Sequence, residues 1–206
     1  MKREMRILFI GNSITWHPVK EEIGWLNEWG MAASCEDNDY VHLAMSKIRK
    51  EIPRAEYKIA WAVAWEREYW DAVHLVAFRE FLNFKPDIIV VKINENVSSR
   101  NNDEHPYKKY YEKLLDYLNP AGTAAMILCT GFWKMGVIDE ATREVALERY
   151  LPIVELNDLD KDEMKAIGLF DHAGVANHPG DKGMEAIAGR ISAELLKTMH
   201  DGSMGG

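Results

Sequence analysis

A serine, an asparagine and a histidine each stand just beyond the expected end of a strand. Ser13 follows the apolar run 5–10, Asn94 and Asn96 follow the apolar run 88–91, and His178 lies in a loop before the last helix. In an open parallel sheet, ligands bind outside the carboxyl ends of the strands. A hydroxyl, an amide donor and a proton acceptor that meet there supply the groups needed for acyl transfer.

Each of these side chains has a role in that reaction. The imidazole of His178 can take the proton of the Ser13 hydroxyl and return it to the leaving alcohol. The amide of an asparagine in the segment 94–97 can donate to the developing oxyanion, and loss of one such donor typically lowers the rate about 100-fold to 1000-fold. Taken singly, each residue has an ordinary structural explanation, such as an asparagine that ends a strand by bonding local backbone. Their convergence favours catalysis.

The hydrophobic pattern predicts the elements that would bring these residues together. Apolar runs predict five strands, at 5–11, 57–63, 88–91, 124–129 and 151–154. Apolar residues at helical spacing predict helices at 41–52, 70–81, 107–118, 139–149 and 184–195. Continuous apolar strands that alternate with amphipathic helices predict a parallel sheet covered on both faces, which is a three-layer α/β/α sandwich. We expect a single domain over 1–200 and a disordered tail at 201–206.

Size and charge narrow the classes of function. A chain of 206 residues that is 47% hydrophobic fits one domain with a large core. The formal net charge of −8 argues against binding to nucleic acid or to an anionic membrane surface. No apolar run approaches the roughly 18 residues of a membrane span. The charged residues 1–5 do not resemble a signal peptide, so we expect a cytoplasmic protein, although a removed leader would leave no trace.

Three blocks of the sequence resemble those of the SGNH (GDSL-type) hydrolases. Residues 11–15 resemble the family's first block, and residues 86–96 resemble its third block. The segment that begins at His178 resembles its last block. The blocks come in the family's order and span nearly the whole chain. The resemblance implies a flavodoxin-like fold and the hydrolysis of an ester or thioester without a cofactor. It makes Ser13 the nucleophile, with its backbone N–H as one oxyanion donor, His178 the base and Asn96 a second oxyanion donor.

The acid of the family's catalytic triad has no counterpart in this chain. The family pattern places an aspartate three residues before the histidine, where Val175 stands here. In a triad, the acid holds the imidazole in its useful tautomer and stabilises the imidazolium. Asp171, Asp181, Glu66 or a backbone carbonyl can take this place, although Asp181 also fits a helix cap. The sequence leaves the choice open.

Two further positions depart from the family pattern. The second-block glycine, which supplies a backbone N–H after the second strand, has no match, and Ala64 is the candidate for that donor. In the third block, Asn94 replaces a glycine and Val97 replaces an aspartate. We expect these last two changes to affect local geometry more than chemistry.

The sequence supports the other histidines less strongly than His178 as the general base. Asp171 and His172 are adjacent and form an alternative acid and base pair. His178 is preferred because Pro179 and a helix start follow it, as in the family. His17 comes too soon after the serine to turn back easily, although it can line the site.

The residues beside the expected strand ends favour a carbohydrate ester as substrate. Three of the seven tryptophans follow strand ends: Trp16, Trp65 and Trp133. Aromatic faces beside polar side chains suit a sugar, and we expect Asn12, Trp65, Glu66 and Glu95 to contact the substrate. No long apolar lid is present, which weighs against a triglyceride lipase. We therefore predict hydrolysis of a short-chain acyl ester, such as an acetyl ester, of a carbohydrate or small metabolite.

Other functions remain open at this point. A non-catalytic ligand-binding domain of the same fold would leave Ser13 and His178 beyond hydrogen-bond reach, roughly more than 4 Å apart. A thioesterase or lysophospholipase would use the same catalytic residues. The sequence has no Gly-rich phosphate loop and no cluster with metal-ligand spacing, so we expect neither a nucleotide nor a metal cofactor. It does not indicate the oligomeric state.

Overall fold

A parallel sheet forms the middle layer of the protein. The structure, a computed structural model, describes residues 4–201. The strands are β1 (Met5–Gly11), β2 (Ala55–Trp61), β3 (Ile88–Lys92), β4 (Ala125–Cys129) and β5 (Ile153–Val154). They lie in the order β2-β1-β3-β4-β5, and every neighbouring pair is parallel. This confirms the predicted α/β fold with its flavodoxin-like strand order.

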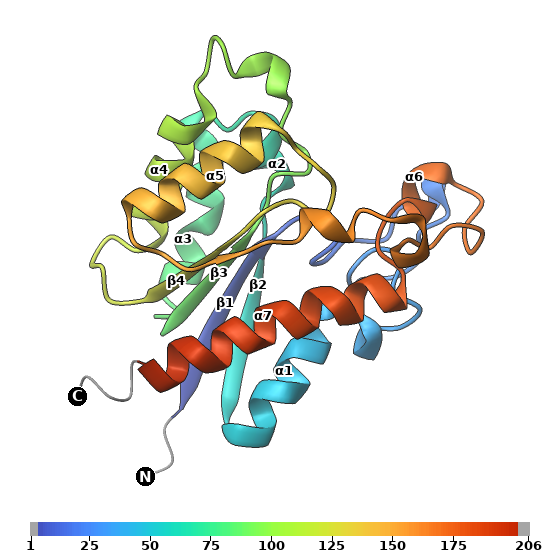
Figure 1. Cartoon of the computed structure of the whole chain (residues 1–206), viewed down its shortest axis with the longest axis horizontal. Coiled ribbons are helices and arrows are strands. Elements are labelled where there is room, and N and C mark those ends of the chain that lie inside the picture. Colours follow the sequence, from blue (N-terminus) through green and yellow to red (C-terminus); the bar gives the residue numbers. More distant parts are fainter. Residues whose placement is uncertain (1–3, 202–206) are drawn as a thin grey trace.

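Helices cover both faces of the sheet (Figure 1). They are α1 (Tyr40–Glu51), α2 (Val63–Arg67), α3 (Arg79–Leu82), α4 (Tyr107–Leu118), α5 (Val137–Glu148), α6 (Ala173–Ala176) and α7 (Asp181–Asp201). Ile7 and Phe9 of β1 pack into the core under α1 and α7, whereas Leu8 and Ile10 pack into the core under α4 and α5. Because successive side chains of a strand point to opposite faces, a strand that is buried on both must be continuously apolar.

Most predicted elements occur with their ends shifted by a few residues. β2 begins and ends two residues earlier than the predicted range 57–63. The last helix is longer than predicted and includes Asp201, a residue of the predicted tail. The rest of that predicted tail, 202–206, lies outside the described residues. Within 4–201, no helix is both long and apolar enough to cross a membrane.

The predicted helix at 70–81 is wrong. This stretch forms a 3-10 helix (Ala72–Phe78) and then the single turn of α3. Phe78 is its buried residue, whereas Val73 and Val76 are 61% and 53% exposed. The apolar residues have helical spacing but little core to pack against. Most of the stability of a helix in a protein comes from packing of its apolar face, so the spacing alone does not produce a long helix.

Long connections gather beyond the carboxyl edge of the sheet. The segment after β1 and the segment after β5 lie side by side near α6 (Figure 1). A small core joins them, with Trp25 and Met31 from the first segment and Ala166 and Val175 from the second. Val175, at the position of the family's aspartate, is therefore a core residue. This packing fixes the two loops that carry the predicted serine and histidine against one another.

Candidate active site

The turn after β1 fixes Ser13 at the edge of the sheet. The N–H of Thr15 donates to the carbonyl of Asn12 at 2.9 Å, and the N–H of Met31 donates to the carbonyl of Ser13 at 2.8 Å. A Cβ on Gly11 would lie 1.8 Å from Thr15 Oγ1, so this close turn requires a glycine. The serine side chain therefore projects from a backbone that is held on both sides.

Ser13 and His178 are within hydrogen-bonding distance. Ser13 Oγ lies 2.8 Å from His178 Nε2, and His178 Nδ1 lies 2.7 Å from the carbonyl oxygen of Gly174. The carbonyl can only accept, so Nδ1 carries the proton and Nε2 presents its lone pair to the serine hydroxyl. The ring of Trp133 packs edge-on against the imidazole, with centroids 5.2 Å apart. The histidine is thereby held as a proton acceptor for the serine.

The ring of His178 is oriented by a backbone carbonyl, one of the alternatives that the sequence left open. Asp181 is the first residue of α7, and its carboxylate accepts hydrogen bonds from Ser34 N at 2.8 Å and from Ser34 Oγ at 2.6 Å. It therefore ties α7 to the first loop. The carboxylate of Glu66 binds asparagine side chains instead of the imidazole. Of the candidates, the carbonyl of Gly174 contacts the ring.

The environment of His178 favours its neutral form. Burial lowers the pKa of His178 to about 4, and the hydrogen bond to the Gly174 carbonyl opposes this shift only in part. An apolar environment disfavours the charged imidazolium. At neutral pH the ring is therefore uncharged and able to accept a proton.

A buried glutamate holds Asn96. Asn96 Nδ2 donates to Glu66 Oε2 at 2.8 Å, and the backbone N–H of Asn96 donates to Glu66 Oε1 at 3.3 Å. An amide nitrogen has two protons, so one remains available to a ligand. Asn96 also lines the same pocket as Ser13. The side chain is therefore positioned to donate a hydrogen bond beside the serine.

Glu95 and Lys92 form a buried ion pair beneath this site. Glu95 also accepts hydrogen bonds from Phe132 N at 2.8 Å and from Asn12 Nδ2 at 2.5 Å. Burial acts to raise the pKa of Glu95, but Lys92 and these hydrogen bonds outweigh it and hold the pKa below its usual value. Burial, followed by the charge of Glu95, raises the pKa of Glu66. Within residues 4–201, no group of His, Cys, Asp and Glu side chains is arranged to hold a metal ion.

Asn94, at the position where the family pattern has a glycine, adopts a backbone conformation that favours glycine. Its φ is 132°, in a region that favours glycine and costs other residues about 1–3 kcal/mol. Its N–H donates to Glu66 Oε1 at 2.7 Å, its Nδ2 donates to Thr142 Oγ1 at 3.1 Å, and its Oδ1 accepts from the Tyr107 hydroxyl at 2.7 Å. These hydrogen bonds offset the strain and fix the turn after β3.

The predicted substrate contacts at Asn12, Trp65, Glu66 and Glu95 are wrong. Asn12 and Glu66 are 0% exposed, Trp65 is 1% exposed, and the side chain of Glu95 is 1% exposed. Trp65 packs against Tyr107, with ring centroids 6.1 Å apart. The polar side chains bind one another, because the turns beyond β1, β2 and β3 need buried hydrogen-bond partners. These buried side chains stabilise the turns that carry the site and are not accessible to a substrate.

Val63, and not Ala64, reaches the pocket. Ala64 is exposed on the surface of α2, whereas Val63 lines the same pocket as Ser13. Both residues are in the first turn of α2, where backbone N–H groups have no acceptor within the helix. The position of the pocket therefore favours the N–H of Val63 over that of Ala64 as the second-block donor.

A pocket of about 350 Å³, the Ser13 pocket, opens over Ser13 and His178. Its lining includes three residues that the sequence analysis missed, namely Lys20, Trp61 and Arg67. Trp61 ends β2, whereas the predicted strand ran to residue 63, so the sequence analysis did not place Trp61 at a strand end. Lys20 lies in an irregular segment and Arg67 belongs to no motif, so no signal in the sequence marks either of them.

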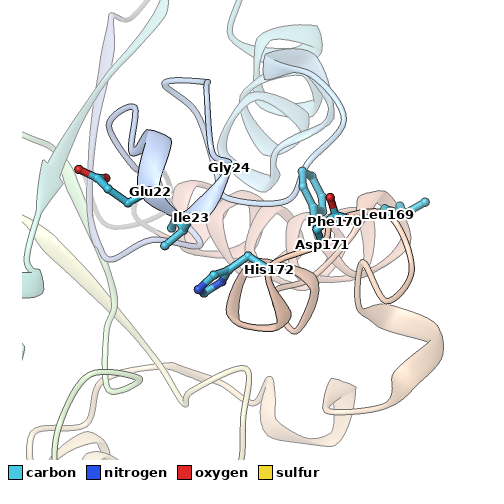
Figure 2. A pocket seen from close by; sticks show the side chains of 7 residues that line it. All are labelled: Glu22, Ile23, Gly24, Leu169, Phe170, Asp171 and His172. Carbon is cyan, nitrogen blue, oxygen red and sulfur yellow. The ribbon is translucent and has the colours of Figure 1, made fainter.

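A second pocket, of about 520 Å³, adjoins the first (Figure 2). Ile23 and His172 line both pockets, and Figure 2 shows the side chain of His172 extending toward Ile23. His172 Nδ1 accepts a hydrogen bond from Val175 N at 3.3 Å, and Asp171 lines the second pocket. The alternative pair of Asp171 and His172 is therefore not the one that hydrogen-bonds Ser13.

No protein-family model and no curated protein sequence matches this chain. Solved structures match it over nearly its whole length. A two-domain esterase active on acetylated mannans is 20% identical, with a TM-score of 0.64 over 95% of this chain and 50% of that one. A family two carbohydrate esterase from Clostridium thermocellum is 13% identical, with a TM-score of 0.61 over 95% and 64% of the two chains. A GDSL-like lipase from Bacteroides thetaiotaomicron is 16% identical, with a TM-score of 0.54 over 94% and 88%.

The chain has the α/β fold of the SGNH (GDSL-type) hydrolases, as its sequence blocks predicted. It spans about half the length of the two-domain esterase. A fold hosts many chemistries, so the reaction of this chain must follow from its own side chains.

Proposed function

We propose that this chain is a carboxylic ester hydrolase in which Ser13 is the nucleophile and His178 is the base. The contact of 2.8 Å between Ser13 Oγ and His178 Nε2 carries this proposal, since the other ring nitrogen is committed to the Gly174 carbonyl. A non-catalytic binding domain predicts a separation of roughly 4 Å or more between these two side chains. The observed contact therefore favours catalysis.

In the first half of the reaction, Ser13 Oγ attacks the ester carbonyl carbon while its proton passes to His178 Nε2. The carbonyl oxygen becomes an oxyanion. The free Nδ2 proton of Asn96, together with the backbone N–H groups of Ser13 and Val63, supplies donors for that charge. The tetrahedral intermediate collapses, the bond to the alcohol breaks, and the alcohol leaves with the proton from Nε2. An acyl group remains on the serine.

In the second half, water replaces the alcohol. His178 Nε2 takes a proton from the water as its oxygen attacks the acyl carbon, and a second oxyanion forms in the same place. Collapse breaks the bond to Ser13 Oγ, which recovers its proton from Nε2. The products are a carboxylic acid and an alcohol. The Gly174 carbonyl keeps Nδ1 protonated in both halves, so the dyad needs no carboxylate to set its tautomer.

We infer that the acyl group is short and that the alcohol is a carbohydrate or a small metabolite. The Ser13 pocket has apolar lining residues, such as Trp61 and Val63, beside polar ones, such as Asn96, which suits a sugar ring with its apolar faces and polar rim. Among the proteins of this fold, the two-domain esterase acts on acetylated mannans. A thioesterase would use the same residues and is distinguished by assay with a thioester.

Covalent labelling tests the nucleophile directly. Diisopropyl fluorophosphate should phosphorylate Ser13, whose Oγ displaces fluoride, and the adduct should be found on the peptide that contains this serine. Hydrolysis of p-nitrophenyl acetate should stop in step with labelling, and the acetyl ester should be cleaved faster than the octanoyl ester. An adduct on another serine, or the absence of both labelling and hydrolysis, would contradict the proposed mechanism.

The activity should persist to unusually low pH. Because burial lowers the pKa of His178 to about 4, the base stays neutral until the pH falls through about 4. We therefore expect kcat/KM for p-nitrophenyl acetate to stay level from about pH 8 to about pH 5 and to decline below that, since kcat/KM reports ionisation of the free enzyme. Circular dichroism at each pH separates this decline from unfolding. A decline centred near pH 6.5, the ordinary value for histidine, would show that the base is not desolvated as the structure indicates.

A further inference from the structure

The charge of the Ser13 pocket is opposite to the charge of the chain. The chain carries a formal net charge of −8. The lining of the pocket nevertheless includes Lys20 and Arg67, and none of its lining residues within 4–201 is an aspartate or a glutamate. Glu22, two positions after Lys20, lines the second pocket, where its carboxylate points away from His172 (Figure 2). The Ser13 pocket is therefore lined by two positively charged side chains and by no carboxylate among residues 4–201.

Within residues 4–201, neither Lys20 nor Arg67 stabilises the fold through an ion pair or a side-chain hydrogen bond. Three arginines elsewhere in the fold, Arg143, Arg149 and Arg190, form ion pairs with carboxylates. In the part of the chain that the structure describes, Lys20 and Arg67 form no ion pair and no side-chain hydrogen bond. Both side chains are exposed to solvent at the pocket. Their charges are thus available to a ligand.

The backbone segments that carry Lys20 and Arg67 are held in place beside the proposed catalytic residues. The N–H of Lys20 donates to the carbonyl of Trp25 at 2.7 Å, and Trp25 is a core residue of the first loop. Arg67 is the last residue of α2 and directly follows Glu66, which holds Asn96. The two charges therefore approach the pocket from two different segments.

The electrostatic effect of both cations reaches the pocket lining. His17 lines the Ser13 pocket. Burial lowers the pKa of His17, and the charges of Lys20 and Arg67 lower it further. An anion placed among these side chains would meet attraction from both cations without repulsion from a lining carboxylate.

We propose that the substrate is an anionic ester, whose carboxylate, phosphate or sulfate group binds Lys20 and Arg67 while its ester group lies at Ser13. This inference rests on the proposed ester hydrolysis. It sets the substrate apart from an acetylated mannan, which is uncharged. The anionic group belongs either to the alcohol part, as in an acetylated uronic acid, or to the acyl part, as in a dicarboxylic acid monoester.

Matched pairs of esters test this inference. One pair places the charge in the alcohol part, with an acetylated methyl glucuronide against the corresponding acetylated methyl glucoside. The other pair places it in the acyl part, with a monosuccinyl ester against the butyryl ester of the same alcohol. We expect kcat/KM to be about tenfold or more higher for the charged member of one pair, the effect of a single charge-assisted hydrogen bond. The pair that shows the preference locates the anionic group.

Variants and salt identify the residues responsible. The double variant Lys20→Gln/Arg67→Gln should bring the preference down to within about twofold, whereas Lys50→Gln/Arg79→Gln, which removes the same charge from exposed sites elsewhere, should retain it. Raising the ionic strength from about 0.05 M to about 0.5 M should weaken the preference in the wild-type protein. If the wild-type protein cleaves p-nitrophenyl acetate but shows no preference in either pair, the inference of an anionic substrate is wrong. If it cleaves no ester at all, the proposed function fails and this inference falls with it.

Discussion

Replacement of Ser13 by alanine should lower kcat/KM for p-nitrophenyl acetate about 1000-fold or more, because the reaction loses its nucleophile. His178 would retain its hydrogen bond to the Gly174 carbonyl, so the base would still be present with nothing to activate. The residual rate would come from binding and the oxyanion donors alone. Initial rates at several substrate concentrations, for wild type and variant at the same pH, give the comparison.

The matched control is Ser46→Ala, which makes the same substitution at an exposed position of α1. It should leave kcat/KM within about twofold of wild type, since exposed substitutions rarely disturb a fold. Thermal unfolding of both variants shows whether they fold like the wild-type protein. Turnover by Ser13→Ala at the wild-type rate would remove Ser13 as the nucleophile.

The positions of the predicted dyad follow from the fold class. Ser13 comes after β1, and the loop that contains His178 comes after β5. Because the carboxyl ends of parallel strands lie at the same edge of a sheet, these two residues are expected close together. This geometry requires only the order of strands and helices, which the apolar runs reveal. The orientation of the ring does not follow in this way. The backbone carbonyl of Gly174, in α6, accepts a hydrogen bond from the imidazole. Because every residue has a backbone carbonyl, the residue type does not indicate which carbonyl will orient the ring.

The failed predictions of substrate contacts concern which way side chains face. Glu66 and Glu95 are carboxylates beside strand ends, and carboxylates are seldom fully buried unless they are paired. The sequence does not show that Asn12 lies between them or that Lys92 neutralises one of them. These contacts depend on turns held by tertiary packing. Residue types therefore predicted the edge of the sheet at which the candidate site lies, whereas three-dimensional contacts distinguish the residues that line its pocket from those buried beneath it.

Replacement of Asn96 by alanine should lower kcat about 100-fold to 1000-fold with little change in KM, because the lost hydrogen bond forms to the oxyanion. The structure favours an effect of this size because Asn96 is held in place before any substrate binds. Glu66 fixes one of its Nδ2 protons and its backbone N–H, so the remaining proton has a set direction. Preorganised donors of this kind cost no reorganisation during the reaction.

Folding effects must be separated from this loss, because Asn96→Ala also removes one donor from the buried carboxylate of Glu66. An unsatisfied group of this kind costs about 1–3 kcal/mol of stability, which thermal unfolding would detect. Labelling by diisopropyl fluorophosphate gives an independent readout, since its phosphoryl oxygen would occupy the position of the oxyanion and labelling should slow as well. The control Asn83→Ala, at an exposed asparagine after α3, should change neither rate. If Asn96→Ala folds normally and keeps kcat within about threefold of wild type, Asn96 is not an oxyanion donor, and the backbone N–H groups of Ser13 and Val63 must stabilise the charge alone.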